Sequence, residues 1–104
     1  MSENKPMTIT EFLEARIGED EARAKYVSEY GDTGGLFDPA RVLAECAAKR
    51  AVIEQRQTYA KAVAESEGIA FVGARCGQEV IGDVLKLLAA VYKHHPDYQQ
   101  EWAL

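Results

Sequence analysis

The sequence predicts an all-α protein, a small three-helix bundle with a long central helix and a short C-terminal helical turn. Helix-start signatures at Thr8 and at Asp38, and apolar residues that recur every three or four positions in three segments, predict this class. The 104 residues suit one domain with a modest core. We expect residues 1–7 to form a flexible N-terminal segment and residues 8–104 a single helical domain.

The first predicted helix begins after Thr8 and runs to about Glu29. Thr8 can cap the helix while Glu11 reaches back to the Thr8 amide, which is the capping-box pattern. Its apolar face consists of Ile9, Phe12, Leu13, Ile17, Ala24, Val27 and Tyr30. Gly18 weakens the middle by about 1 kcal/mol relative to alanine, so we expect the helix to bend or fray there.

The second predicted helix begins with Asp38 as the cap and Pro39 at the first helical position, where a missing N–H costs nothing. We expect it to run to about Glu67 and to stop at Gly68. Such a helix is about 40 Å long at 1.5 Å per residue, which is longer than the other two predicted helices.

The apolar stripe of the second helix is thin. Its inward residues are Val42, Leu43, Cys46, Ala47, Ile53, Ala60, Val63 and Ala64. Lys49 and Arg50 occupy positions where a heptad seam would have apolar groups, whereas Val52 and Tyr59, seven residues apart, form a second narrow apolar strip. We therefore expect the far half of this helix to need a partner.

The third predicted helix spans residues 77–93 and is the most hydrophobic element. Its broad apolar face is made of Val80, Ile81, Val84, Leu85, Leu88, Val91 and Tyr92. We expect this face to form the centre of the core. Residues 68–73 are predicted to be an apolar loop that folds back onto the helices, because a lone strand would have nothing to pair with.

Two motifs resemble those of a known family. They are Asp38-Pro39-Ala40-Arg41-Val42-Leu43 and the C-terminal His95-Pro96-Asp97-Tyr98 followed by Trp102. With them the chain resembles, over roughly residues 8–102, a family of short actinobacterial and actinobacteriophage proteins of unknown function. The resemblance implies a bacterial or phage origin in the cytoplasm. It carries over no catalytic residue, because the family has none assigned.

Composition excludes several classes of function. The net charge of −5, with eight acidic and four basic groups in residues 1–37, argues against direct binding of nucleic acid. The longest apolar run, residues 84–92, is interrupted by Lys86 and is far shorter than a membrane span. Cys46 and Cys76 form no paired motif, and no signal-peptide pattern opens the chain, so we expect a cytoplasmic protein.

The C-terminal segment contains the side chains that invite a chemical role. His94, His95 and Asp97 could bind a metal ion, but adjacent side chains at a helix end diverge. We interpret Asp97 as the cap of a final turn. Tyr98 and Trp102, four residues apart, lie on one side of a helical turn, where they either close the end of the bundle or anchor a partner.

The sequence contains no catalytic motif, and we expect neither an enzyme nor a cofactor. The favoured function is a non-catalytic protein–protein interaction module, such as a phage or mobile-element accessory protein that binds a host protein or self-associates through helix two as a homo-oligomer. The candidate partner-binding residues are Val52, Tyr59, Tyr98 and Trp102.

Two alternative functions remain at this stage. A metal-dependent or thiol-dependent small enzyme would need Cys76, His94 and His95 to converge. An acidic nucleic-acid mimic would need acidic groups arrayed like phosphates. Those groups are Glu3, Glu11, Glu14, Glu19, Asp20 and Glu21.

Overall fold

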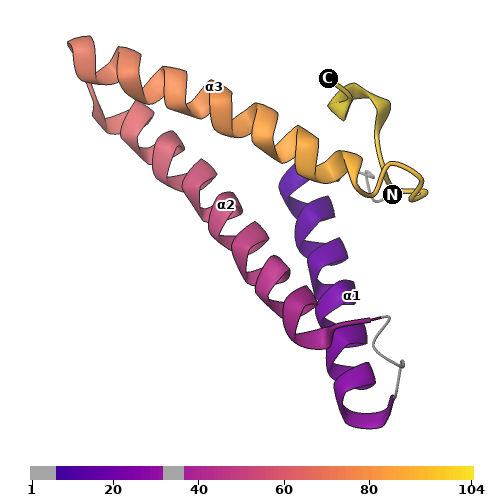
Figure 1. The fold of residues 1–104 in the computed structure, drawn as a ribbon. Helices are drawn as coiled ribbons and strands as arrows, with labels where there is room; N and C mark the ends of the chain where they lie inside the picture. Colours follow the sequence, from indigo (N-terminus) through magenta and orange to yellow (C-terminus); the bar gives the residue numbers. More distant parts are fainter. Residues whose placement is uncertain (1–6, 32–36) are drawn as a thin grey trace, which may run out of the picture.

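The computed structural model describes residues 7–31 and 37–104, so most of the predicted N-terminal segment lies outside the described residues. The described part contains helices α1 (Ile9–Tyr30), α2 (Pro39–Glu65) and α3 (Gly68–Ala90), a 3-10 helix η1 (Gln100–Trp102) and no strand. The predicted all-α bundle of three helices with a short C-terminal turn is confirmed (Figure 1). The central helix α2 is the longest, at 27 residues.

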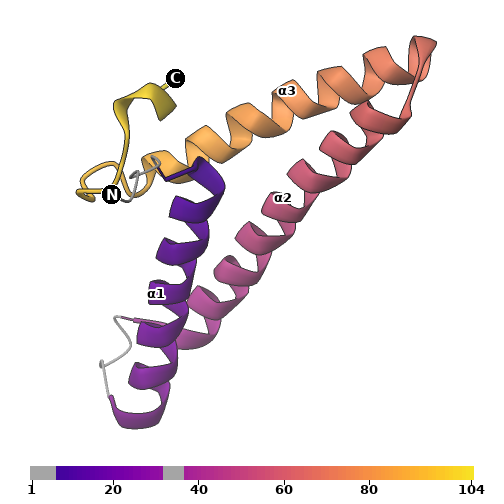
Figure 2. The same cartoon turned by 180° about the vertical axis from the view of Figure 1, so that it is seen from behind.

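Helices α2 and α3 form a hairpin whose two arms diverge from its tip (Figure 1). Helix α1 lies across the open end, against the first half of α2 and close to the last turns of α3 (Figure 2). The molecule measures 56 × 37 × 25 Å, and its radius of gyration of 16.9 Å exceeds the value of about 13 Å expected for a compact chain of this length. The half of the hairpin nearest its tip, which we call the narrow half, therefore extends beyond the part that α1 covers.

Both predicted helix starts are confirmed. The Thr8 hydroxyl accepts a hydrogen bond from the Glu11 amide at 3.1 Å, and the Glu11 carboxylate accepts one from the Thr8 amide at 2.9 Å. The Asp38 carboxylate accepts one from the Arg41 amide at 3.2 Å, with proline following the cap. Helix α1 continues without a break through Gly18, so the expected fraying there is wrong.

The connection between α2 and α3 differs from the sequence prediction. Residues 68–73 are not a loop but the first turns of α3, which begins at Gly68 and ends at Ala90 rather than spanning residues 77–93. Gly68 adopts a positive φ of 62°, a left-handed conformation that reverses the chain immediately after α2. The apolar residues that follow then continue as helix instead of folding back.

The centre of the core also differs from the prediction. The buried apolar residues are Phe12, Leu13, Ile17, Ala24, Cys46, Ile53, Leu85, Ala89 and Trp102. Helix α1 supplies four of them and α3 only Leu85 and Ala89. The most hydrophobic helix is thus not the core's centre, because α3 diverges from α2 and only its last turns lie near α1. The core lies at the wide end of the hairpin.

Candidate functional site

Helix α3 carries apolar side chains on the side that faces away from the core. We call this set the outer stripe: Ile69, Val72, Cys76, Val80, Leu87 and Val91. Its five aliphatic members are between 59% and 92% exposed, and Cys76 is exposed as well. Asp83 is the one charged residue on the same line of the helix. Large aliphatic side chains in a continuous exposed row are typical of an interaction surface.

Helical geometry separates the outer stripe from the buried face. At about 100° per residue, the stripe falls within an arc of roughly 100°. Leu85 and Ala89, which are buried, project from the opposite side of the helix. A helix that is apolar on both sides normally lies inside a protein, but α3 is buried only at Leu85 and Ala89, near its C-terminal end.

The narrow half of the hairpin contributes nothing to the core. Residues 54–84 are all described, and none of them is buried. In this half the ring of Tyr59 on α2 lies close to Gly77 on α3. Val52 is partly buried and packs against the core. The strip predicted from Val52 and Tyr59 therefore lies along the inside of the hairpin, and a partner-binding role for it stays a prediction.

The C-terminal segment forms an aromatic cluster around Phe12. The Phe12 ring centroid lies 5.0 Å from that of Trp102, 6.1 Å from Tyr98 and 5.7 Å from His95. Trp102 is only 7% exposed, and Tyr98 is partly buried. The segment thus closes the wide end of the bundle. Trp102 could serve as a partner anchor only by leaving this cluster.

His95 pairs with a buried arginine. A guanidinium nitrogen of Arg16, which is 7% exposed, lies 2.7 Å from Nδ1 of His95, and Arg16 also donates to Glu19 at 3.0 Å. The Asp97 amide donates to the same ring at 3.0 Å. The predicted role of Asp97 as a helix cap is wrong, because the final turn begins after Gln99.

The three groups of the hypothetical metal or thiol site do not converge. Cys76 lies in the first half of α3, whereas His94 and His95 follow its C-terminal end. From Cys76 to the end of the helix at Ala90, α3 alone rises about 21 Å at 1.5 Å per residue. Within residues 7–31 and 37–104, no group of three or more histidine, cysteine or acidic side chains could hold a metal ion.

Polar contacts hold α1, α2 and the end of α3 together. The Tyr92 hydroxyl donates to Asp20 at 2.7 Å and accepts from Lys49 at 3.0 Å, and burial raises the pKa of Tyr92. Arg50 donates twice to Glu21, at 2.7 and 3.0 Å, and this hydrogen bonding lowers the pKa of the Glu21 carboxyl.

The sequence reasoning missed these polar contacts. One signal pointed to them, because Lys49 and Arg50 occupy seam positions where apolar residues were expected. Both side chains are partly buried against α1 or the end of α3, instead of lying on a solvated face. A cation on the inward edge of a helix indicates an acceptor across the interface.

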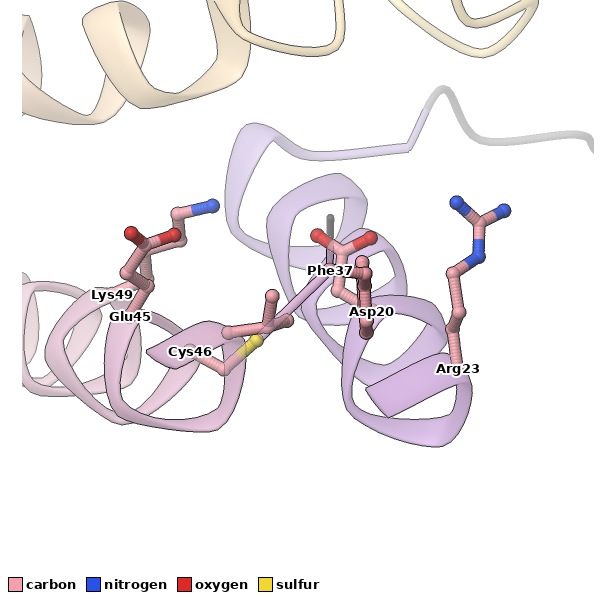
Figure 3. A pocket seen from close by; sticks show the side chains of 7 residues that line it. Asp20, Arg23, Phe37, Glu45, Cys46 and Lys49 are labelled. Atoms are coloured by element: carbon pink, nitrogen blue, oxygen red, sulfur yellow. The ribbon is translucent and has the colours of Figure 1, made fainter. Parts of the chain in front are cut away.

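A hollow of about 180 Å³ lies between α1 and the start of α2 (Figure 3). Asp20 and Arg23 of α1 and Glu45 and Lys49 of α2 line it, with Cys46 beneath them. Burial raises the pKa of the Cys46 thiol, which keeps it protonated and unreactive at neutral pH. The hollow is smaller than typical small-molecule pockets, and its lining includes no nucleophile with an adjacent base.

The chain belongs to a family of unknown function, DUF6221, whose model matches residues 6–104. No curated protein and no solved structure matches it significantly. Among the described residues, none of the helices combines the length and the apolar character needed to span a bilayer.

Proposed function

We propose that this protein is a non-catalytic protein–protein interaction module and that its binding surface is the outer stripe of α3. The observation that carries the proposal is an exposed apolar row along the length of α3, a helix that buries only Leu85 and Ala89 of its opposite side in the core. Each aliphatic side chain of the stripe would contribute about 1.5–3 kcal/mol on complete burial. A partner helix lying along α3 is the simplest structure that would bury them.

Helix α2 is a weaker candidate for the same task, although self-association through it was predicted from the sequence. Its exposed residues beyond the core are mostly polar or small: Glu54, Gln55, Arg56, Gln57, Thr58, Ala60 and Lys61. They would gain little from burial, because charged and amide groups must first lose their water. The proposal therefore places the contact on α3.

The biological setting is a further part of the proposal. The resemblance of the two motifs to those of short actinobacterial and actinobacteriophage proteins is the support for an accessory protein of a phage or mobile element that acts in a bacterial cytoplasm. A host protein or a second copy would then be the partner.

A role as a nucleic-acid mimic has less support. Several acids of α1 are engaged within the molecule: Glu11 caps its own helix, Asp20 accepts from Tyr92 and Glu21 binds Arg50. Such groups are not free to imitate a row of phosphates. The separation of Cys76 from the histidines likewise gives the enzyme alternative no support from these three groups.

Stripe-dependent binding tests the proposal. The variant Val80→Glu/Leu87→Glu places two charges in the outer stripe, and Ala51→Glu adds a charge at an exposed position of α2 as a matched control. Unchanged far-ultraviolet circular dichroism would establish that both variants fold.

Immobilised wild type and the Ala51→Glu control should retain the same protein from a bacterial lysate, or further copies of this chain. The Val80→Glu/Leu87→Glu variant should not retain that protein. The same difference between the variants should appear when the retained protein is purified and tested for binding to each of them. The proposal would be contradicted if the wild type, the control and the stripe variant retained the binding protein equally. It would also be contradicted if the wild type retained neither a lysate protein nor further copies of this chain.

A further inference from the structure

We infer that the partner of the outer stripe is a second copy of this chain, and that two α3 helices pack antiparallel about a two-fold axis at Val80. This inference rests on the proposed function. It follows from the spacing of the stripe, from the position of its one charged residue and from the size of the surface.

The stripe repeats with a period of eleven residues. Ile69, Val80 and Val91 are eleven apart and all β-branched, and Cys76 and Leu87 have the same separation. Eleven residues make very nearly three full turns of an α-helix. Residues eleven apart therefore lie almost in line, and the row stays nearly straight along α3. A straight row can contact a second straight row over its whole length without strong supercoiling.

The repeat is also nearly symmetric about its midpoint. A two-fold axis through Val80 brings Ile69 of one copy opposite Val91 of the other. The same axis places Val72 of one copy within one residue of the level of Leu87 of the other copy. Val80 of one copy then lies against Val80 of the other. Such self-complementarity is what an isologous dimer interface requires.

Asp83 decides between the two orientations. In a parallel pair, in register, the two Asp83 carboxylates would meet within an apolar seam, which is costly for like charges. In the antiparallel pair, Asp83 lies opposite Gly77, and the two carboxylates are about 9 Å apart along the axis.

The antiparallel pair also supplies a counter-charge. Arg75 of the second copy then lies about 3 Å from the level of Asp83, within reach of an ion pair. Within one copy, Arg75 pairs loosely with Glu79, at 3.9 Å among exposed groups. Arg75, Glu79 and Lys86 flank the stripe, and together with Asp83 on its line they carry no net charge, although the whole chain carries −5.

The size of the surface predicts a weak dimer. Residues 69–91 span about 33 Å, and a helix is about 10 Å wide, so each copy would bury roughly 330 Å². The total is below the standard size of about 1,600 Å² for stable complexes. We therefore expect a reversible dimer with a dissociation constant in about the micromolar range or above.

Sedimentation velocity over a concentration series tests the inference on the full chain. The wild type and the Ala51→Glu control should shift from monomer to dimer with concentration, whereas Val80→Glu should stay monomeric. Asp83→Leu, which makes the stripe continuously apolar, should lower the dissociation constant about tenfold or more. A wild type that is monomeric at roughly 1 mM, or a dimer unaffected by Val80→Glu, would overturn the inference.

Disulfide cross-linking tests the orientation. In the antiparallel pair, two Cys76 residues lie about 12 Å apart along the axis, beyond disulfide range, so the wild type should not cross-link on mild oxidation. The Val80→Cys/Cys76→Ser variant should cross-link readily, because residue 80 lies on the two-fold axis. Rapid cross-linking of the wild type would instead indicate a parallel pair and overturn the inference.

The two proposals can fail separately. If the wild type is monomeric but still retains another protein through the outer stripe, only the inference of a second copy is wrong. If it is monomeric and retains nothing, the proposed function is wrong as well.

Discussion

The ring of Tyr59 on α2 lies against the backbone of Gly77 on α3, where a Cβ atom would come within 2.6 Å of Cδ1 and 2.8 Å of Cζ. No side chain fits at residue 77 unless the tyrosine ring moves. This contact lies in the half of the hairpin that has no buried residue.

Replacing Gly77 by alanine should destabilise the protein, although alanine favours a helix by about 1 kcal/mol over glycine. The matched variant Gly73→Ala, with nothing within 4 Å of the new atom, should instead gain up to about that amount. Urea denaturation of both variants measures the difference. A Gly77→Ala protein as stable as Gly73→Ala would contradict the close contact.

Replacing Trp102 by alanine should lower the free energy of unfolding by about 3–5 kcal/mol, because the ring is 7% exposed and packs on Phe12. Leu104→Ala, two residues away and 71% exposed, should change it by less than about 0.5 kcal/mol. Thermal and chemical denaturation provide the comparison. A neutral Trp102→Ala variant would favour the partner-anchor role over the packing role.

Replacing Glu21 by glutamine should change how stability depends on pH. Hydrogen bonding from Arg50 lowers the pKa of Glu21 below its ordinary value of 4.5. The ionised Glu21 carboxylate therefore adds to the free energy of unfolding above pH 4.5. This stabilisation is lost as the pH falls through the lowered pKa.

The urea midpoint of the wild type should accordingly exceed that of Glu21→Gln at pH 7, and the two should converge towards pH 3. Glu54→Gln, at an exposed position of α2, serves as the control and should follow the wild type. A gap between wild type and Glu21→Gln that stays constant across this range would rule out the linkage.

Replacing Tyr92 by phenylalanine removes the hydroxyl that lies between Asp20 and Lys49. Hydrogen bonds to charged groups contribute about 1.5–3 kcal/mol each before any new pairing, so a measurable loss of stability is expected at neutral pH. Burial raises the pKa of Tyr92 above its ordinary value of 10. The protonated Tyr92 hydroxyl therefore adds to the free energy of unfolding below pH 10. This stabilisation is lost as the pH rises through the raised pKa.

Spectroscopic titration of tyrosine ionisation checks the second part of this prediction. The wild type should contain a tyrosine that ionises above the ordinary pKa of 10, and the Tyr92→Phe variant should lack it. A late-ionising tyrosine that persists in the variant would show that another residue is responsible.

Local signals explain which parts of the fold could be predicted. The starts of α1 and α2 were correct because Thr8, Glu11 and Asp38 form their caps with amides three residues away. The start of α3 was not predicted correctly, because residues 69–73 resemble a strand or loop in composition. In the structure these residues follow a left-handed turn at Gly68 and form the first turns of α3.

The outer stripe could not be assigned from the sequence for a different reason. Val80 and Val91 were placed on the inward face, because a helix that is apolar on most sides gives no periodic signal for which side meets the core. The position of α1 decides this, and it depends on contacts between residues far apart in the chain. The polar pairs of Lys49 and Arg50 were missed for the same reason.

The narrow half of the hairpin has a consequence for how the molecule opens. Its backbone hydrogen bonds are shielded by few packed side chains, none of them buried, whereas those around Phe12 are covered by the core. Amide hydrogens of residues 54–84 should therefore exchange with solvent deuterium through partial unfolding, well before the wide end opens. Global stability and the persistence of the hairpin tip are then two separate quantities in this protein.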